Sequence, residues 1–347
     1  MGTVAAAPLR TAVVGFGISG KVFHAPLIAA NPEFSLDVIV TARPERAAEA
    51  ARLYPQARIV GTPEELFALA GDLDLVILGT PPHTHYGLAA TAIAHGLHVV
   101  VDKPFVPTTA LGEELVSRAS DGGVQLTVFQ NRRWDADFLT LQKVLASGAL
   151  GDVRSFESRF EWWRPEGFGN WRDTVSLAEG GGILNDLGAH LIDQAIQLFG
   201  PVERSYGETA NRGPHPDAAD TEAFVSLLHE SGVRSRLWMN GMAAQVGPRF
   251  HVLGSEAGYT KWGLDGQEPA LAAGIPPSDP AYGVDSQERW GLLGVDGSTA
   301  PVPAERGDYP KFYVQLAAAL RGSGPLPVDP AGPLEVLKVI EGIHALA

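Results

Sequence analysis

Residues 11–20 read TAVVGFGISG, and this stretch decides the fold. The β-branched run Thr11–Val14 is typical of a buried strand, and the glycines after it have the spacing G-x-G-x-x-G. In that spacing one glycine permits a tight turn, one lets a pyrophosphate approach the backbone, and one lets a helix pack against the strand. The stretch therefore predicts a dinucleotide site that includes Gly15, Phe16, Gly17, Ile18, Ser19 and Gly20.

The same alternation of strand and helix continues from Leu9 to Gln130. Short apolar runs predict six strands: Thr11–Val14, Leu36–Thr41, Ala57–Val60, Leu73–Leu78, Leu97–Val101 and Val124–Phe129. Helical patterns lie between them: Lys21–Ala30, Glu45–Leu53, Pro63–Leu69, His85–His95 and Thr109–Ala119. Because crossover connections are right-handed and put helices on both faces of a sheet, the alternation predicts an α/β fold, a Rossmann doubly wound parallel sheet. This context favours a dinucleotide site over a plain tight turn at residues 15–20.

The pattern changes after Gln130, and we expect a dinucleotide-binding domain at 1–130 and a substrate-binding and oligomerisation domain at 131–347. The second domain is predicted to be α+β with a large open, mainly antiparallel sheet. Its expected strands are Val153–Arg164, Phe224–His229, Val233–Met239, Phe250–Leu253 and Tyr259–Trp262, and its expected helices are Asp135–Ser147, Tyr313–Leu320 and Leu334–Leu346. Residues 264–310 are rich in Gly and Pro and are expected to form long loops.

Composition excludes several classes of function. Lys plus Arg is 26 and Asp plus Glu is 40, so the net charge is −14 and nucleic acid is an unfavourable partner. There is no cysteine, which excludes disulfides, thiolate metal sites and cysteine nucleophiles. No apolar run approaches the roughly 20 residues that span a bilayer, and the N-terminus does not resemble an export signal. We therefore expect a cytoplasmic enzyme with no membrane partner.

The end of the second strand indicates which dinucleotide is bound. NAD sites usually place an acid there for the adenosine ribose, but this strand ends in Thr41-Ala42-Arg43, and Asp37 lies at its start. The hydroxyl of Thr41 and the guanidinium of Arg43, with help from Arg46, are suited to a 2′-phosphate. NADP(H) is therefore preferred and NAD(H) remains possible. The alternative is that Arg43 is an ordinary solvated surface arginine.

A second ligand-facing stretch, Thr80-Pro81-Pro82-His83-Thr84-His85, follows the fourth strand. Ligands bind at the carboxyl ends of such strands, so Thr80, Pro81 and His85 are candidate cofactor contacts. His85 has two interpretations of equal weight, a structural cap and a neighbour of the nicotinamide ribose. A zinc site is disfavoured, because no further ligand follows His83 and His85 nearby.

The candidate catalytic groups lie in two stretches. Lys103 comes immediately after the fifth strand, where it would reach the nicotinamide pocket. In GGGILNDLGAHLID at 180–193, Asp186 and His190 are spaced i, i+4 and so lie about 6 Å apart on one helix face. The three glycines before them would let the backbone approach a flat ring. An acid and an imidazole beside a lysine can move a proton while a hydride leaves carbon. The alternatives are a metal pair without a third ligand and a structural helix histidine.

These motifs together resemble the Gfo/Idh/MocA oxidoreductase family. The resemblance rests on GFGISGKVFHAPLI at 15–28, VVVDKPF at 99–105, QNRRWDADF at 130–138 and GGGILNDLGAHLIDQ at 180–194. KWGLDGQEPAL at 261–271 is similar to the branch that includes NADP-dependent scyllo-inositol dehydrogenases. The similarity covers essentially the whole chain and is specific for the family more than for a substrate.

The resemblance implies a Rossmann domain followed by a domain whose open sheet builds homodimers or homotetramers. It implies oxidation of a secondary hydroxyl of a sugar or cyclitol, or reduction of the matching ketone, with Lys103, Asp186 and His190 as catalytic residues. His190 would accept the hydroxyl proton, Lys103 would hold that oxygen, and Asp186 would bond a neighbouring hydroxyl and orient His190. Asp102 stands where the family has Glu in Glu-Lys-Pro, a shortening we expect to be tolerated.

Aromatic faces suit the C–H surfaces of sugars, while Arg and Asn bond hydroxyls. On these grounds, together with Asp186, the candidate substrate contacts are Asn131, Arg132, Trp163, Arg164, Trp171 and Arg172. For each of them, core packing or a surface ion pair is an equally good interpretation. No metal ligand set is predicted.

The leading hypothesis is an NADP(H)-dependent oxidoreductase acting on a sugar or cyclitol. One alternative is an NAD-dependent glycosidase of the same fold, which the missing acid after the second strand disfavours. The other is a non-catalytic dinucleotide-binding regulator. It is disfavoured because a sensor needs no proton path such as the one that Lys103, Asp186 and His190 would form.

Overall fold

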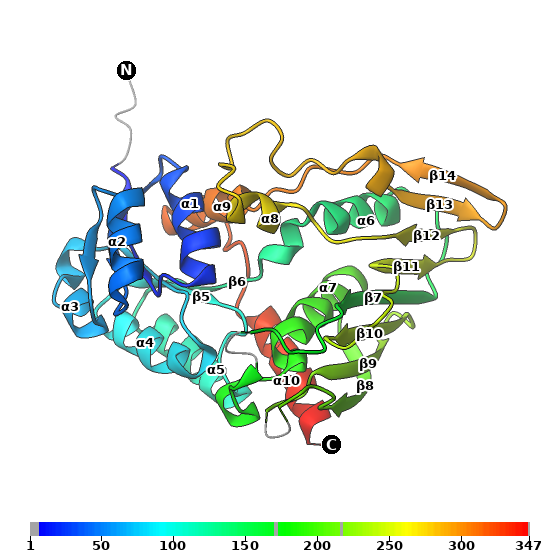
Figure 1. Ribbon diagram of the computed structural model, residues 1–347, viewed down its shortest axis with the longest axis horizontal. Coiled ribbons are helices and arrows are strands. Elements are labelled where there is room, and N and C mark those ends of the chain that lie inside the picture. The colour runs from blue at the N-terminus through cyan, green and yellow to red at the C-terminus, as the bar shows by residue number, and fades with distance from the viewer. Residues whose placement is uncertain (1–6, 170–172, 216–217, 346–347) are drawn as a thin grey trace.

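Two β-sheets organise the protein, and the chain passes from one to the other once and then returns (Figure 1). The computed structural model describes residues 7–169, 173–215 and 218–345. The first sheet is parallel, with the strand order β3-β2-β1-β4-β5-β6, which confirms the predicted Rossmann fold. Its strands are β1 (Leu9–Val14), β2 (Phe34–Val40), β3 (Arg58–Val60), β4 (Leu75–Leu78), β5 (His98–Asp102) and β6 (Leu126–Phe129).

Helices connect these strands as predicted, although their first and last residues differ from the predicted ones. They are α1 (Ala25–Ala29), α2 (Pro44–Leu53), α3 (Pro63–Phe67), α4 (Pro82–Ala94) and α5 (Thr109–Asp121), with a 3-10 turn η2 (Ala70–Asp72) after α3. The first predicted helix is divided into a π-helix η1 (Ser19–His24) and α1. Pro26 has no N–H to donate, so the backbone hydrogen bonds change their pattern near this point.

The second sheet has eight strands in the order β14-β13-β12-β11-β7-β10-β9-β8. It contains β7 (Ser155–Glu161), β8 (Val202–Ala210), β9 (Glu222–His229), β10 (Arg234–Asn240), β11 (Phe250–Leu253), β12 (Gly258–Lys261), β13 (Gly291–Val295) and β14 (Ser298–Val302). Only the β7–β10 pair is parallel, so the predicted mainly antiparallel sheet is confirmed. Helices α6 (Ala136–Ala146) and α7 (Ala189–Phe199) belong to this part of the chain, and α7 packs against β7 and β10.

The expectation of long loops at 264–310 was wrong. This region holds α8 (Gln267–Ala272), η7 (Gln287–Arg289), β13 and β14. Gly and Pro hide these strands from a sequence pattern, but an edge strand tolerates a proline such as Pro301 because one side of it needs no partner. The sequence also gave no sign of β8, because most of its side chains are exposed and its pairing with β9 defines it.

The end of the chain returns to the first core. Helix α9 (Pro310–Leu320) lies beyond residue 130, yet Phe312 packs edge-on against Phe129 and Trp134 with ring centroids 4.9 and 5.7 Å away. Helix α10 (Ala331–His344) then packs against α5 on one side and α7 on the other. Each sheet has its own hydrophobic core, but residues 309–337 contribute to the first one. The division at residue 130 stays a prediction.

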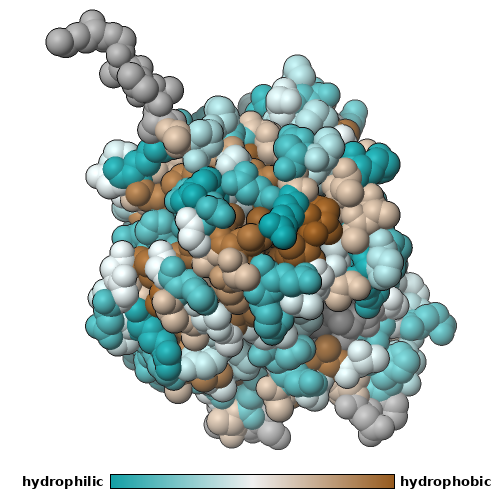
Figure 2. Space-filling model, turned by 90° about the vertical axis from the view of Figure 1, so that its left-hand side faces the viewer, coloured by the Kyte–Doolittle hydropathy of each residue, from teal (hydrophilic) through white to brown (hydrophobic). Residues whose placement is uncertain are grey.

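The outer surface of the Rossmann part is mostly polar. Figure 2 shows this end of the molecule, where hydrophilic side chains surround smaller apolar areas. Helix α2 contributes to this surface, because Ala50 is its one fully buried residue. In the described ranges, no helix is long and apolar enough to cross a membrane.

Phe312 tests the return of the chain to the first core. Its side chain is fully buried, so Phe312→Ala should lower the free energy of unfolding by about 3–5 kcal/mol. Val314→Ala on the same helix is the control, because Val314 is 59% exposed and should change stability by less than about 1 kcal/mol. Urea denaturation followed by tryptophan fluorescence measures both. Equal effects of the two variants would contradict the packing of α9.

Candidate active site

The glycine-rich turn has the geometry that a dinucleotide needs. Gly15 has φ of +93°, and a Cβ there would lie 2.7 Å from the carbonyl oxygen of Gly79. A Cβ on Gly20 would lie 1.9 Å from the carbonyl oxygen of Gly15, so only glycine lets η1 approach β1 this closely. Gly17 is open, because the nearest neighbour of its Cβ position is the Arg46 guanidinium at 3.5 Å. The turn therefore fits a pyrophosphate beside Gly17.

The other residues of this turn differ in what they offer. Phe16 is buried, with its ring edge-on to Tyr54 at 6.3 Å, which leaves only its backbone for a ligand. Ile18 is 58% exposed. The hydroxyl of Ser19 is buried beside Gly79.

The end of β2 carries no acidic side chain. Thr41 is half-buried and donates its backbone N–H to the Val60 carbonyl at 3.0 Å. Arg43 is exposed at the N-cap of α2, and Arg46 lies one turn further, next to Gly17. Two guanidinium groups therefore flank the place where the adenosine ribose would bind in this fold.

His85 acts as a clamp between two loops. Its ring is fully buried, with Nε2 at 2.8 Å from the Thr80 carbonyl and Nδ1 at 3.0 Å from that of Phe105. Burial lowers the pKa of His85 although Asp102 opposes the shift. Of the two interpretations of His85, these contacts support the structural one. Thr80 bonds Thr84 through their hydroxyls at 2.6 Å, and Pro81 is exposed at the start of α4.

Lys103, Asp186 and His190 meet between the two sheets. Lys103 follows β5, and its Nζ donates to Asp186 Oδ1 at 2.6 Å and to the Asp186 carbonyl at 3.1 Å. Asp186 lies on a π-helix η6 (Leu184–Gly188), and His190 on α7 directly after it. The predicted single helix is thus divided into a π-helix and an α-helix at the candidate catalytic residues. π-Helical turns are frequent at functional sites.

The glycines before Asp186 allow the protein backbone to pack closely on its neighbours, and their predicted approach to a flat ring stays a prediction. A Cβ on Gly182 would lie 2.2 Å from Asp220 Oδ1, and one on Gly181 would lie 2.2 Å from the Val175 carbonyl. A side chain at either position would therefore overlap protein atoms. Asp220 accepts the Leu184 N–H at 2.8 Å, so this crowding fixes the start of η6.

The surroundings of His190 keep its imidazole uncharged. The residue is buried, and Nδ1 has no hydrogen-bond partner within the described part of the chain. Burial lowers the pKa of His190 well below 6.5, and the positive charges of Lys103 and Arg132 lower it further, while Asp186 opposes them. At neutral pH the ring can therefore accept a proton.

Asp102 stands at the position where the family that the sequence resembles has a glutamate, whose side chain is one carbon longer. Its Oδ1 accepts the Lys103 N–H at 2.8 Å, and its Oδ2 lies 3.9 Å from Nε2 of the buried His24. Burial would raise the pKa of Asp102, but His24, Lys103 and Ser19 outweigh it and the net shift is downward. The shorter carboxylate thus stays charged behind the backbone of Lys103.

The six candidate substrate residues are not all brought together. Asn131 and Arg132 lie in the 3-10 turn η3 (Asn131–Trp134) after β6, and Arg132 bonds Glu268 of α8 at 2.8 Å. Trp163 is largely exposed beyond β7. Trp171 and Arg172 lie outside the described residues.

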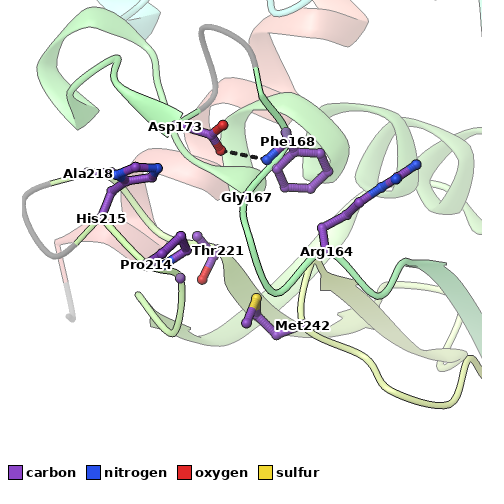
Figure 3. Close-up of a pocket in the computed structure, with 10 residues that line it drawn as sticks. Arg164, Gly167, Phe168, Asp173, Pro214, His215, Ala218, Thr221 and Met242 are labelled. Carbon is purple, nitrogen blue, oxygen red and sulfur yellow. Dashed lines mark hydrogen bonds between the residues drawn. The ribbon is translucent and has the colours of Figure 1, made fainter.

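Arg164 belongs to a separate hollow. Figure 3 shows this hollow, which Phe168, Asp173, His215 and Met242 also line. The side chain of Arg164 extends away from His215 in this view. Neither Lys103, Asp186 nor His190 is among its lining residues.

The sequence reasoning missed three neighbours of His190. They are Phe160, whose ring meets His190 edge-on at 6.2 Å, the buried Arg249, and Gln194, which bonds both Arg249 and the Arg132 carbonyl. Gln194 follows His190 by one helical turn, so its spacing was a usable signal. Nothing in the sequence distinguishes Arg249. In the described ranges, no group of three or more acidic or histidine side chains is placed to hold a metal.

Comparison with known proteins agrees with this arrangement. A family model described as an oxidoreductase family with an NAD-binding Rossmann fold matches residues 9–130, and the GFO/IDH/MocA C-terminal domain matches 138–260. The chain belongs to the Gfo/Idh/MocA family of oxidoreductases. It is 35% identical to the scyllo-inositol 2-dehydrogenase (NADP(+)) of Bacillus subtilis (strain 168), over 96% of this chain and 92% of that protein.

Two further family members are similar over their whole length. An uncharacterized oxidoreductase of Escherichia coli (strain K12) is 39% identical, over 96% of this chain and 94% of that one. The crystal structure of an oxidoreductase from Bacillus cereus superposes with a TM-score of 0.84 at 28% identity, covering 96% of this chain and 95% of that one. These relatives place the two-sheet architecture within the family.

Gly20 tests the close contact that builds the cofactor turn. Gly20→Ala should destabilise the protein by about 3 kcal/mol or more, because its methyl group would overlap the Gly15 carbonyl. Gly71→Ala is the control, since no atom lies within 4 Å of a Cβ there. Thermal unfolding measured by circular dichroism compares the two. A Gly20→Ala protein as stable as the control would refute the tight turn.

Proposed function

We propose that the protein is an NADP(H)-dependent oxidoreductase that acts on a secondary hydroxyl, or the matching ketone, of a sugar or a cyclitol such as scyllo-inositol. The observation that carries this proposal is the group formed by the half-buried Lys103 and the buried Asp186 and His190 at the carboxyl edge of a Rossmann sheet. The printed names of relatives support the substrate class. They include a scyllo-inositol 2-dehydrogenase, a levoglucosan dehydrogenase and a D-apiose dehydrogenase.

The three side chains supply complementary chemistry. His190, uncharged at neutral pH, accepts the proton of the reacting hydroxyl. Lys103 donates a hydrogen bond to the same oxygen and balances the negative charge that develops there. Asp186 holds Lys103 in place and bonds a neighbouring hydroxyl. A bound nicotinamide takes up or supplies the hydride.

The remaining contacts of the substrate come from polar and aromatic residues near this group. Asn131 and Arg132 stand at the end of β6 and are the nearest candidates. Trp163 and Arg164 would act from the segment after β7, and Trp171 and Arg172 complete the proposed set. These assignments rest on the chemistry of the side chains.

The preference for NADP(H) rests on Arg43 and Arg46. Arg43 is the N-cap residue of α2 and Arg46 lies in its first turn, and no acidic side chain stands at the end of β2 to repel a 2′-phosphate. Thr41 offers a hydroxyl beside them. A charge-assisted hydrogen bond contributes about 1.5–3 kcal/mol, so each arginine is worth roughly 10- to 100-fold in affinity.

Replacing these arginines tests the cofactor preference. Arg43→Ala and Arg46→Ala should each weaken NADPH binding by roughly 10- to 100-fold and leave NADH binding unchanged, since NADH lacks the 2′-phosphate. Arg52→Ala, at the exposed far end of the same helix, is the matched control. Titration of nicotinamide fluorescence gives the affinities. Tighter binding of NADH that no variant changes would contradict the preference, and co-purified stoichiometric NAD would favour a glycosidase.

The pH dependence tests the role of His190. Because its pKa lies well below 6.5, kcat/KM for oxidation should stay level as the pH falls from about 8 to 6.5 and should decline only in more acid solution. Reduction needs the protonated ring, so its rate should rise as the pH falls. Absorbance of NADPH with a polyol and sugar panel measures both directions. His190→Gln should lower kcat at least about 100-fold. An oxidation rate that already falls above pH 6.5 would exclude His190 as the acceptor.

We further propose that the protein is a cytoplasmic homodimer or homotetramer whose partners are small-molecule sugars or polyols, without nucleic acid or membrane. The net charge of −14 supports the exclusion of nucleic acid. The face of the second sheet opposite α7 supports the assembly, because Phe224 and Trp238 pack together there at 5.2 Å and Tyr206 is exposed on the same face. Light scattering on the purified protein measures the number of subunits.

A further inference from the structure

Arg249 is a buried charge that the proposed reaction does not use. It precedes β11, its side chain is 1% exposed, and Asp137 is equally buried beside it. Arg249 Nε donates to Asp137 Oδ2 at 3.1 Å, Nη2 donates to Gln194 Oε1 at 2.7 Å, and Nη1 donates to the Ser158 hydroxyl. Burying a guanidinium is costly, so a feature of this kind calls for an explanation beyond stability.

Two routes connect Arg249 with His190. The guanidinium lies over the Phe160 ring, 4.3 Å from its centroid, and the same ring meets His190 edge-on at 6.2 Å. The second route is α7, where Gln194 lies one turn after His190 and donates to the Arg132 carbonyl at 2.9 Å. Arg132 also lies over Phe160, at 5.0 Å.

Charged groups on several elements surround His190. Lys103 after β5, Arg132 in η3 and Arg249 before β11 are positive, and Asp186 in η6 is negative. Further charges on adjoining elements are already paired: Asp135 and Glu268 with Arg132, Asp137 of α6 with Arg249, Asp193 of α7 with Arg133, and Glu341 of α10 with Thr109. Lys103, Arg132 and Arg249 thus place three positive charges near His190, each beside a carboxylate, and a buried cation disfavours a second positive charge nearby more strongly than one in water.

We propose that Arg249 is a positioning residue that keeps His190 in its uncharged, proton-accepting form and, through Gln194, holds Arg132 in place beside it. The inference deepens the proposed function and rests on it, since it names what prepares the proton acceptor. In this proposal Arg249 acts through His190 and Arg132, and its own hydrogen bonds go to Asp137, Ser158 and Gln194.

The test is a direct titration of His190. Protein labelled with ¹³C-histidine is titrated by NMR, and the His190 signal is assigned by its absence from the His190→Gln protein. In the wild type the ring should remain uncharged at pH 6.5. The double variant Asp137→Asn/Arg249→Gln removes both buried charges and leaves no lone carboxylate. It should raise the His190 midpoint by about one pH unit, a tenfold gain in proton affinity.

Two further variants sharpen the result. Arg249→Met leaves Asp137 unpaired and should raise the midpoint further, provided that it folds. Arg159→Met is the matched control, because Arg159 neighbours Phe160 on β7 but points to the opposite face, where it stacks on Trp238 at 4.0 Å and pairs with Glu157. It removes one positive charge from the same strand and should leave the midpoint unchanged.

Rate measurements separate this inference from the proposed function. In the double variant the acid limb of kcat/KM for oxidation should move up with the midpoint. A midpoint that rises without any change in the rate profile would uphold the role of Arg249 and refute His190 as the proton acceptor. Three results would overturn the inference: a wild-type ring that is already charged at pH 6.5, an unchanged midpoint in the double variant, or an equal shift in Arg159→Met.

Discussion

The ion pair between Lys103 and Asp186 joins the two halves of the protein. Lys103 extends from the carboxyl end of a parallel strand in the first sheet, and Asp186 belongs to the helical segment that packs on the second sheet. Both side chains are mostly withdrawn from water, so breaking the pair would leave a poorly solvated charge. The contact therefore sets the distance between the cofactor turn and the residues that would handle the substrate. The other contacts of the site are arranged around it.

Around this pair the protein accumulates positive charge and keeps its histidine neutral. Arg132 and Arg249 both lie over the Phe160 ring, which meets His190 edge-on, and a carboxylate partner holds each of them in place. Such an environment costs stability, but it gives an imidazole that accepts a proton near neutral pH. The same charges would attract the developing negative charge on a substrate oxygen.

Local patterns predicted much of this arrangement. The glycine spacing after a β-branched run gave the cofactor turn, because only glycine permits the backbone contacts at Gly15 and Gly20. The i, i+4 spacing of Asp186 and His190 placed them together even though a π-helix interrupts their helix. By contrast, β13 and β14 were not predicted, because the pairing of β13 with β12 and of β14 with β13 defines these strands more than their side chains do.

By itself the sequence determined the alternation of strands and helices, the dinucleotide turn and the three candidate catalytic residues. These follow from short-range steric and periodic constraints, which neighbouring residues carry. The tertiary structure alone decided that α9 completes the first core, that His85 clamps two loops and that Arg249 lies behind His190. Arg249 and His190 are far apart along the chain, and their proximity depends on how β7, β11 and α7 pack. Burial then sets the charge of each group, because electrostatic interactions depend on the surrounding dielectric, which no local pattern encodes.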